Sequence, residues 1–221
     1  MKKIKSIILC TLMMFLSTSK NSNLVSALDS SESIAWNKKL SNGTTFNYWI
    51  DSNCEYTSSI PSAANGLMYP NGLYNPISMY QTNIKSNSIM DFYQISSCSG
   101  FWENTAGATS TFRKNSSGQY YQMSNIEKDW YDWIYAEITI NDYYLCTSVF
   151  NSYFAPYGDN ITGGNVNTFR KKIIIHEMCH ALGCKDLKYE GNKDSIMYYI
   201  GTAGTGLSLT TDANQVLINK Y

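Results

Sequence analysis

Two histidines and a glutamate lie close together in the segment His176-Glu177-Met178-Cys179-His180, and these are the only two histidines of the chain. Residues four apart lie one above the other on the same face of an α-helix, so His176 and His180 can bind one metal ion. Glu177 lies about 100° around the helix from His176. From there its carboxylate can reach a water on the metal without replacing it, as a general base must. The motif predicts hydrolysis of peptide bonds with Zn²⁺ as the ion.

A catalytic zinc site normally has three protein ligands and one open position. The helix is expected to end at Gly183, and Asp186 follows three residues later. Aspartate is an acceptable zinc ligand. A glycine allows the sharp turn that brings the chain back toward the metal. Asp186 is therefore one candidate for the third ligand.

Other residues are alternative candidates for the third ligand. Asp194 and Asp212 lie further downstream, whereas Cys184 and Glu190 lie near the motif. A Cys184 thiolate would bind zinc strongly but would make a less usual protease site. Cys179 lies between the two histidines, where we expect it to pack or to form a disulfide.

The segment from His176 to Asp186 resembles the extended motif HExxHxxGxxH of the metzincin superfamily of zinc endopeptidases. His176, Glu177, His180 and Gly183 match this motif in register. Asp186 stands where most of the superfamily has a third histidine, and this is similar to the HExxHxxGxxD form of snapalysin-like secreted bacterial metzincins. The resemblance implies a zinc metalloendopeptidase whose zinc is bound by His176, His180 and Asp186.

The segment Ser195-Ile196-Met197-Tyr198-Tyr199 resembles the Met-turn that lies beneath the zinc in metzincins. The resemblance implies that Met197 supports the histidine ligands from below. It also implies a catalytic role for Tyr199 in stabilising the tetrahedral intermediate, although ordinary packing is an equal alternative in a chain with 18 tyrosines. Finally, it implies a capped terminal helix over residues 207–221 and an edge strand over residues 137–141, along which the peptide substrate adds as a further strand.

The motif must be carried by a long, buried helix. Asn167 or Thr168 is expected to be its N-cap, and Gly183 the left-handed residue at its end. Apolar residues cover most of its circumference, which indicates a helix inside the core: Phe169, Ile173, Ile174, Ile175, Met178, Ala181 and Leu182.

The remaining elements predict an α+β fold. Residues 44–50 and 133–141 are the stronger strand candidates, and residues 90–97 and 109–113 are the weaker ones. Residues 60–80 contain three prolines and two glycines and are expected to be a loop with at most a short helix. We predict a metzincin-like zinc protease domain with a twisted, mixed, mostly parallel sheet, a long active-site helix and a small C-terminal lobe.

The N-terminus has the pattern of a secretory signal peptide. Three lysines precede an uncharged apolar stretch from Ile7 to Leu16, which is too short to span a bilayer as a helix. Val25-Ser26-Ala27 supplies a small-x-small cleavage site. We predict a signal peptide over residues 1–27 and a metalloprotease catalytic domain over residues 28–221. The protein is expected to be secreted and extracellular, with no membrane span after processing.

The charge of the chain bears on its partners. Four of the 17 basic residues and none of the 17 acidic residues lie in the predicted signal peptide, which leaves 13 basic against 17 acidic residues. A mildly acidic chain without a cluster of Lys or Arg is poorly suited to a phosphate backbone, which excludes nucleic acid as the primary partner. The expected partner is a polypeptide substrate, and the protein is expected to be a monomer.

Five cysteines remain after the predicted processing: Cys54, Cys98, Cys146, Cys179 and Cys184. This is an odd number in a compartment that permits disulfides, and the sequence does not choose among the possible pairs. None of the spacings is CxxC, which argues against a structural zinc knuckle.

The main alternative to an enzyme is a secreted or cell-surface binding domain in which zinc only stabilises the fold. A structural zinc site normally has four protein ligands and is closed to solvent. In such a protein the carboxylate of Glu177 would have no task. The two hypotheses therefore differ in one respect: an enzyme needs the carboxylate of Glu177, and a binding domain does not.

Overall fold

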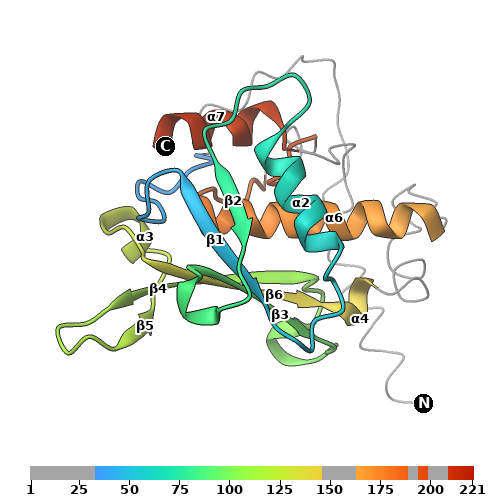
Figure 1. Ribbon diagram of the computed structural model, residues 1–221, viewed down its shortest axis with the longest axis horizontal. Helices are drawn as coiled ribbons and strands as arrows, with labels where there is room; N and C mark the ends of the chain where they lie inside the picture. Colours follow the sequence, from blue (N-terminus) through green and yellow to red (C-terminus); the bar gives the residue numbers. More distant parts are fainter. Residues whose placement is uncertain (1–32, 146–162, 189–193, 199–208) are drawn as a thin grey trace, which may run out of the picture.

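The computed structural model describes residues 33–145, 163–188, 194–198 and 209–221, and this part of the chain has an α+β fold (Figure 1). The predicted signal peptide, Cys146, Glu190 and Tyr199 lie outside the described residues. The strands are β1 (Thr45–Ile50), β2 (Ser78–Gln81), β3 (Met90–Ile95), β4 (Gly107–Lys114), β5 (Tyr120–Gln122) and β6 (Tyr135–Asn141). The α-helices are α2 (Ser59–Met68), α3 (Glu127–Trp130), α4 (Asp142–Leu145), α6 (Gly163–Leu182) and α7 (Thr211–Lys220), and two short 3₁₀ helices are η2 (Lys85–Asn87) and η3 (Gly100–Trp102).

The six strands form one mixed sheet in the order β2-β1-β3-β6-β4-β5. The first four strands of this order are parallel, whereas β4 and β5 run antiparallel to their neighbours. Parallel neighbours need a crossover connection, and α2 supplies it between β1 and β2. The predicted mixed, mostly parallel sheet is confirmed.

Strand β6 lies inside the sheet, with β3 on one side and β4 on the other. The prediction that residues 137–141 form an edge strand is therefore wrong. Alternate side chains of β6, those of Ala136, Ile138 and Ile140, are fully buried, as a central strand packed on a helix requires. Strand β4 follows β6, and the short β5 at the edge of the sheet pairs only with the end of β4 from Phe112 to Lys114.

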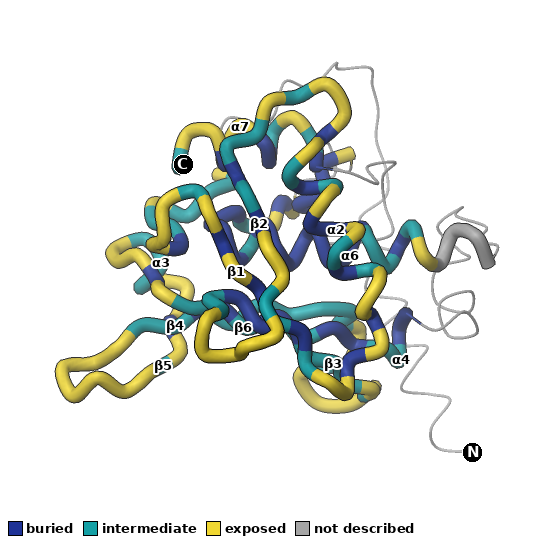
Figure 2. Tube along the Cα trace, in the orientation of Figure 1, coloured by how far each residue is buried: buried dark blue, intermediate teal, exposed yellow. Residues whose placement is uncertain are grey.

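Helix α6 is the centre of the core. It packs on β4, β6 and α2, and Figure 2 shows that it is buried over most of its described length. The side chains of Ile174, Ile175 and Met178 are fully buried, which confirms the prediction of a buried helix. Trp133 lies two positions before β6. Its indole Nε1 donates a 2.7 Å hydrogen bond to the carbonyl of Ala181 and so links α6 to the start of β6.

The ends of α6 agree only in part with prediction. The helix begins at Gly163, so neither Asn167 nor Thr168 is its N-cap. The side-chain oxygen of Asn167 instead accepts a 3.2 Å hydrogen bond from the guanidinium of Arg170, one turn further along the helix. The C-terminus is as predicted, because the helix ends at Leu182 and Gly183 has a φ of 115°.

Residues 60–80, predicted to be mainly loop, contain a ten-residue helix α2 and the strand β2. Pro61 lies in the first turn of α2, where a missing amide proton breaks no helical hydrogen bond. Gly66 lies where α2 crosses α6, and a Cβ at this position would be 2.8 Å from the Lys171 side chain. Both residues therefore belong to a helix and its packing rather than to a loop.

The C-terminal helix α7 is also confirmed, although its predicted cap differs. Thr210 precedes the helix but makes no side-chain cap bond. Its hydroxyl accepts a 3.1 Å hydrogen bond from the amide of Ile196. The hydroxyl of Tyr221, the last residue, donates a 3.0 Å hydrogen bond to the carbonyl of Leu182 at the end of α6. Among the described helices, none has the length and apolar character needed to cross a membrane.

Candidate metal centre

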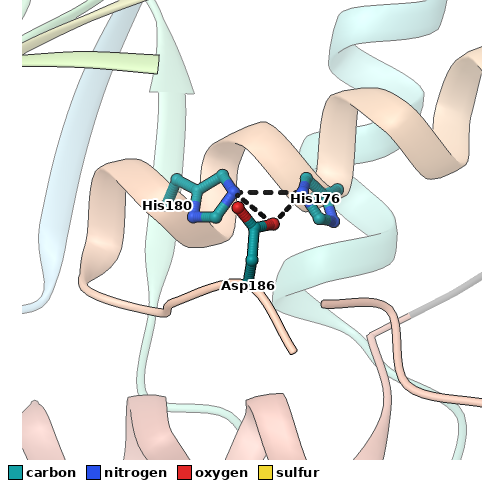
Figure 3. A group of neighbouring side chains, drawn as sticks. All are labelled: His176, His180 and Asp186. Atoms are coloured by element: carbon teal, nitrogen blue, oxygen red, sulfur yellow. Dashed lines mark hydrogen bonds and ion pairs between the residues drawn. The ribbon is translucent and has the colours of Figure 1, made fainter. Parts of the chain in front are cut away.

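His176, His180 and Asp186 converge at the end of α6 (Figure 3). The two histidines lie one turn apart on the helix, and Asp186 reaches back toward them from the segment after Gly183. The Nε2 atoms of the two rings are 3.0 Å apart. The Oδ1 atom of Asp186 is 3.2 Å from each of them. The structure thus brings together the three ligands that the sequence predicts.

Backbone carbonyls fix the tautomer of both rings. The Nδ1 of His176 lies 2.7 Å from the carbonyl oxygen of Ile196, and the Nδ1 of His180 lies 3.0 Å from that of Cys184. Because a carbonyl oxygen only accepts, each Nδ1 must donate, and in the neutral rings both Nε2 atoms carry lone pairs. Two such lone pairs and a carboxylate oxygen then face one another with no donor among them. This arrangement requires a cation, which is either a proton or a metal ion.

The pKa values of His180 and Asp186 show the same requirement for a cation. Burial lowers the pKa of His180, but the hydrogen bond to Asp186 and the negative charges of Asp186 and Glu177 outweigh it and raise the pKa to about 9. Burial raises the pKa of Asp186, but its hydrogen bonds to both histidines outweigh that effect and hold the pKa well below its ordinary value. A proton on His180 therefore occupies the place that a metal ion would take.

The three ligand atoms have a spacing that suits zinc. A tetrahedral ion with ligand bonds of about 2.0–2.2 Å holds its ligand atoms about 3.3–3.6 Å apart. The observed separations of 3.0 and 3.2 Å are only a few tenths of an ångström shorter. The side chain of Asp186 is 43% exposed, whereas those of His176 and His180 are 11% and 18% exposed. Three ligands and one solvent-facing side match a site with an open position.

A glycine turn directs the chain from His180 to Asp186. The amide of Cys184 donates a 2.9 Å hydrogen bond to the carbonyl of Cys179, and the amide of Gly183 donates one of 3.1 Å to that of His180. This pair of bonds, with the positive φ of Gly183, is the Schellman motif. A Cβ on Gly183 would lie 3.0 Å from the carbonyl oxygen of Lys38, so both conformation and space require glycine here.

An N-terminal segment, residues 34–36, holds the same turn from outside. The amide of Trp36 donates a 3.0 Å hydrogen bond to the carbonyl of Gly183, and the amide of Lys185 donates one of 2.7 Å to that of Ile34. Lys185 also places its ammonium 4.3 Å from the centre of the Trp36 ring. The residues just before Asp186 are therefore fixed by a short antiparallel contact with a segment about 150 positions earlier in the chain.

Residues 195–199 are predicted to be a Met-turn, and the described part of this segment, residues 195–198, contacts the candidate ligands. Met197 is fully buried in the core. Its amide donates a 3.1 Å hydrogen bond to the hydroxyl oxygen of Ser195, and its carbonyl accepts a 2.8 Å hydrogen bond from the amide of Leu187. The preceding carbonyl, that of Ile196, holds the ring of His176. This segment thus contacts one histidine ligand and the residue after Asp186.

Glu177 is held on the other side, by strand β4. Its carboxylate Oε2 accepts a 2.8 Å hydrogen bond from the hydroxyl of Thr109, which also lies 2.9 Å from the Glu177 carbonyl oxygen. A Cβ added to Gly107 would be 2.9 Å from both Cγ and Oε1 of Glu177. The residue is 5% exposed, so the hydroxyl compensates for part of the lost hydration of its carboxylate.

Thr109 and Gly107 were not found from the sequence, because they lie about 70 positions before Glu177 and belong to no local motif. Lys128 was not found either. Burial lowers the pKa of its ammonium, and the negative charges of Asp186 and Glu177 oppose that shift. The pairing of β4 with β6 and the packing of α6 on β4 bring Gly107 and Thr109 to the motif.

The other candidate ligands that the structure describes lie outside this group. Among the described residues, the group whose ligand atoms converge consists of His176, His180 and Asp186 alone. Asp194 is exposed. Cys184 is fully buried, and its thiol is hydrogen-bonded with that of Cys179 rather than with the histidines. Glu190 and Tyr199 lie outside the described residues, so the predicted role of Tyr199 stays a prediction.

Comparison with known proteins does not name a family. No protein-family model and no curated protein matches the chain. Among solved structures, it is similar to a chain of the structure described as the GM1 bound form of the ECX AB5 holotoxin, with 13% identity and a TM-score of 0.39. This match covers 84% of the present chain and 77% of the other. At this identity and TM-score the similarity carries no argument about fold or function.

Proposed function

We propose that the protein is a secreted, metzincin-like zinc metalloendopeptidase with His176, His180 and Asp186 as metal ligands and Glu177 as general base. One observation carries this proposal: two imidazole Nε2 atoms and a carboxylate oxygen converge within 3.2 Å, with Glu177 on the same helix. A structural zinc site would normally be closed by four ligands. Among the described residues only three converge here, which favours a site with a place for water and substrate.

The chain's own residues supply the rest of the chemistry. A zinc ion bound by these ligands would polarise the substrate carbonyl and lower the pKa of a water toward neutrality. Glu177 accepts the proton of the attacking water and later delivers it to the leaving amine. Thr109 binds one carboxylate oxygen, Oε2, and so limits the rotation of the base. Gly107 leaves room for the other oxygen, Oε1.

The edge of β4 favours an extended polypeptide as the substrate. The amide of Asn141 donates to the carbonyl of Ala106, and that of Ile134 donates to the carbonyl of Phe112, so even-numbered residues of this stretch turn their backbone groups toward β6. The backbone groups of Gly107 and Thr109 therefore point away from β6. Within the described residues, β5 covers only the far end of β4. A peptide added along the uncovered part would lie beside Glu177.

Zinc content and casein hydrolysis of the purified wild type and of Glu177→Gln test this function. Glutamine keeps the shape of the side chain and can still contact Thr109, but it cannot accept the proton. We expect one zinc per chain in both proteins and a loss of turnover by at least about 100-fold in the variant. Equal zinc binding with no hydrolysis of any peptide by the wild type would instead indicate a structural site in a binding domain.

A further inference from the structure

Two cysteines occupy defined positions in the turn that joins the second and third candidate ligands. The Schellman motif at the end of α6 contains a hydrogen bond between residues five apart in the chain. The amide of Cys184 donates this bond, and the carbonyl of Cys179 accepts it. Side chains at these two positions commonly contact each other across the turn. Here they are the thiols of Cys179 and Cys184, and both are fully buried.

The backbone geometry permits a covalent bond between them. One 2.9 Å hydrogen bond joins the amide of Cys184 directly to the carbonyl of Cys179. With standard bond lengths, this contact limits the separation of the two Cα atoms to at most about 6.8 Å. Disulfides span Cα separations of about 4.4–6.8 Å. The two thiols also interact with each other, and the structure shows them as two free cysteines.

We propose that Cys179 and Cys184 form an intrachain disulfide that closes the turn between His180 and Asp186. The two thiols lose two protons and two electrons as the sulfur–sulfur bond forms. A small-molecule disulfide such as oxidised glutathione accepts them and is reduced to two thiols, through a mixed disulfide with one cysteine. Because both thiols are buried in the folded chain, the exchange takes place while the chain folds.

The bond bears on the candidate metal site through two contacts. The carbonyl of Cys184 holds the Nδ1 of His180, and Asp186 follows two residues later. A disulfide at Cys184 would restrict both ligands before metal binds, and preorganised ligands bind more tightly. This consequence rests on the proposed function, whereas the disulfide itself does not. We expect its removal to weaken zinc binding on the order of tenfold.

Peptide mapping of the full chain, folded with reduced and oxidised glutathione, tests the bond. Trypsin cuts after Lys172 and Lys185, so one peptide, residues 173–185, contains both cysteines and no other. After alkylation without reduction, we expect this peptide to carry no alkyl group and to be lighter by two hydrogen atoms than the dithiol form. After reduction it should carry two alkyl groups. Two alkyl groups before reduction, or a bond from this peptide to another cysteine, would overturn the proposal.

Measuring zinc affinity tests the effect of the disulfide on the metal site separately from the presence of the disulfide. Cys184→Ala should bind zinc about tenfold more weakly than the wild type, whereas Cys54→Ala, which removes another buried cysteine, should not. Unchanged affinity in Cys184→Ala, with the disulfide present in the wild type, would overturn the effect on the metal site. If the wild type bound no zinc, the proposed function would fail, and the peptide map would still decide whether the disulfide forms.

Discussion

The hydroxyl oxygen of Thr109 lies 2.8 Å from the carboxylate Oε2 of Glu177, and this contact joins strand β4 to helix α6 at the candidate base. A glutamate in an apolar helix must find a polar partner, because an unpaired buried carboxylate is costly. Thr109 supplies that partner from strand β4, and among the described strands β5 covers only the far end of its outer edge. The same strand therefore orients the base and, in the proposed function, lies beside the substrate.

Replacing Thr109 tests whether this hydroxyl positions the base. Thr109→Val keeps the β-branched shape but removes the donor, so the Glu177 side chain becomes free to rotate. We expect kcat to fall about tenfold or more while KM changes little, since a misplaced group affects the chemical step. Thr109→Ser retains the hydroxyl and should keep most of the activity. Steady-state kinetics on one peptide substrate measure both variants.

A merely structural role of Thr109 would give a different result. In that case Val and Ser would alter the melting temperature, and kcat would remain near the wild-type value in both. Zinc content serves as the control, because neither substitution touches a metal ligand. Equal kcat for Thr109→Val and the wild type, at equal zinc content, would remove Thr109 from the proposed machinery.

Replacing Asp186 tests the third ligand. Asp186→Asn keeps the size of the side chain but removes its charge, which both histidines now contact at 3.2 Å. Loss of groups that only support a ligand already costs about 10–100-fold in metal affinity, so loss of this ligand should cost at least about 100-fold. Zinc affinity measured by competition with a chelator decides this. Asp194→Asn, an exposed carboxylate nearby in sequence, is the matched control and should bind zinc as the wild type does.

The pKa shifts of the ligands predict how pH acts on the metal-free protein. The pKa of His180 is raised from 6.5 to about 9 by Asp186, despite the opposing effect of burial. Its contribution to stability is therefore fully present below pH 6.5 and is lost as the pH rises through 9. The pKa of Asp186 is lowered from 3.8, so its contribution is present above that value and is lost as the pH falls. The pair should thus stabilise the metal-free protein most between about pH 4 and 6.5.

Thermal denaturation of chelator-treated protein from pH 5 to 10 measures this effect. The decline between pH 6.5 and 10 should be modest, because solvent reaches the 43% exposed side chain of Asp186 and weakens the pair. Asp186→Asn should show a smaller decline than the wild type. An identical pH profile in the two proteins would contradict the assignment of the shift to this pair. Zinc binding must also displace the proton of His180, so zinc affinity should rise with pH up to about 9.

The convergence of His176, His180 and Asp186 could be predicted from the sequence because their geometry is local. Two histidines four apart on a helix share a face wherever that helix lies. A glycine after the helix brings Asp186 back within a few residues. Thr109 could not be predicted, because its contact with Glu177 spans 68 positions and depends on how β4 pairs with β6 under α6.

The elements that the sequence misassigned also depend on contacts distant in the chain. Residues 60–80 contain prolines and glycines, which favour loops when only local signals are considered. In the fold, Pro61 lies in the first turn of α2 and Gly66 lies against Lys171 of α6. The β-branched and aromatic residues of the segment 133–141 indicated a strand but not its neighbours, and the sheet places that strand centrally rather than at an edge.

Replacing Met197 tests whether the segment beneath the ligands acts through packing. Its side chain is fully buried, so Met197→Ala should lower the free energy of unfolding of the metal-free protein by about 2–5 kcal/mol. Met197→Leu has nearly the same volume and should cost less than about 1.5 kcal/mol. Both variants keep the backbone bond from Leu187 to the Met197 carbonyl, which should hold the ligand segment in place. Urea denaturation measures the stabilities. A cost below about 1 kcal/mol for alanine would show that this side chain contributes little to the stability of the core.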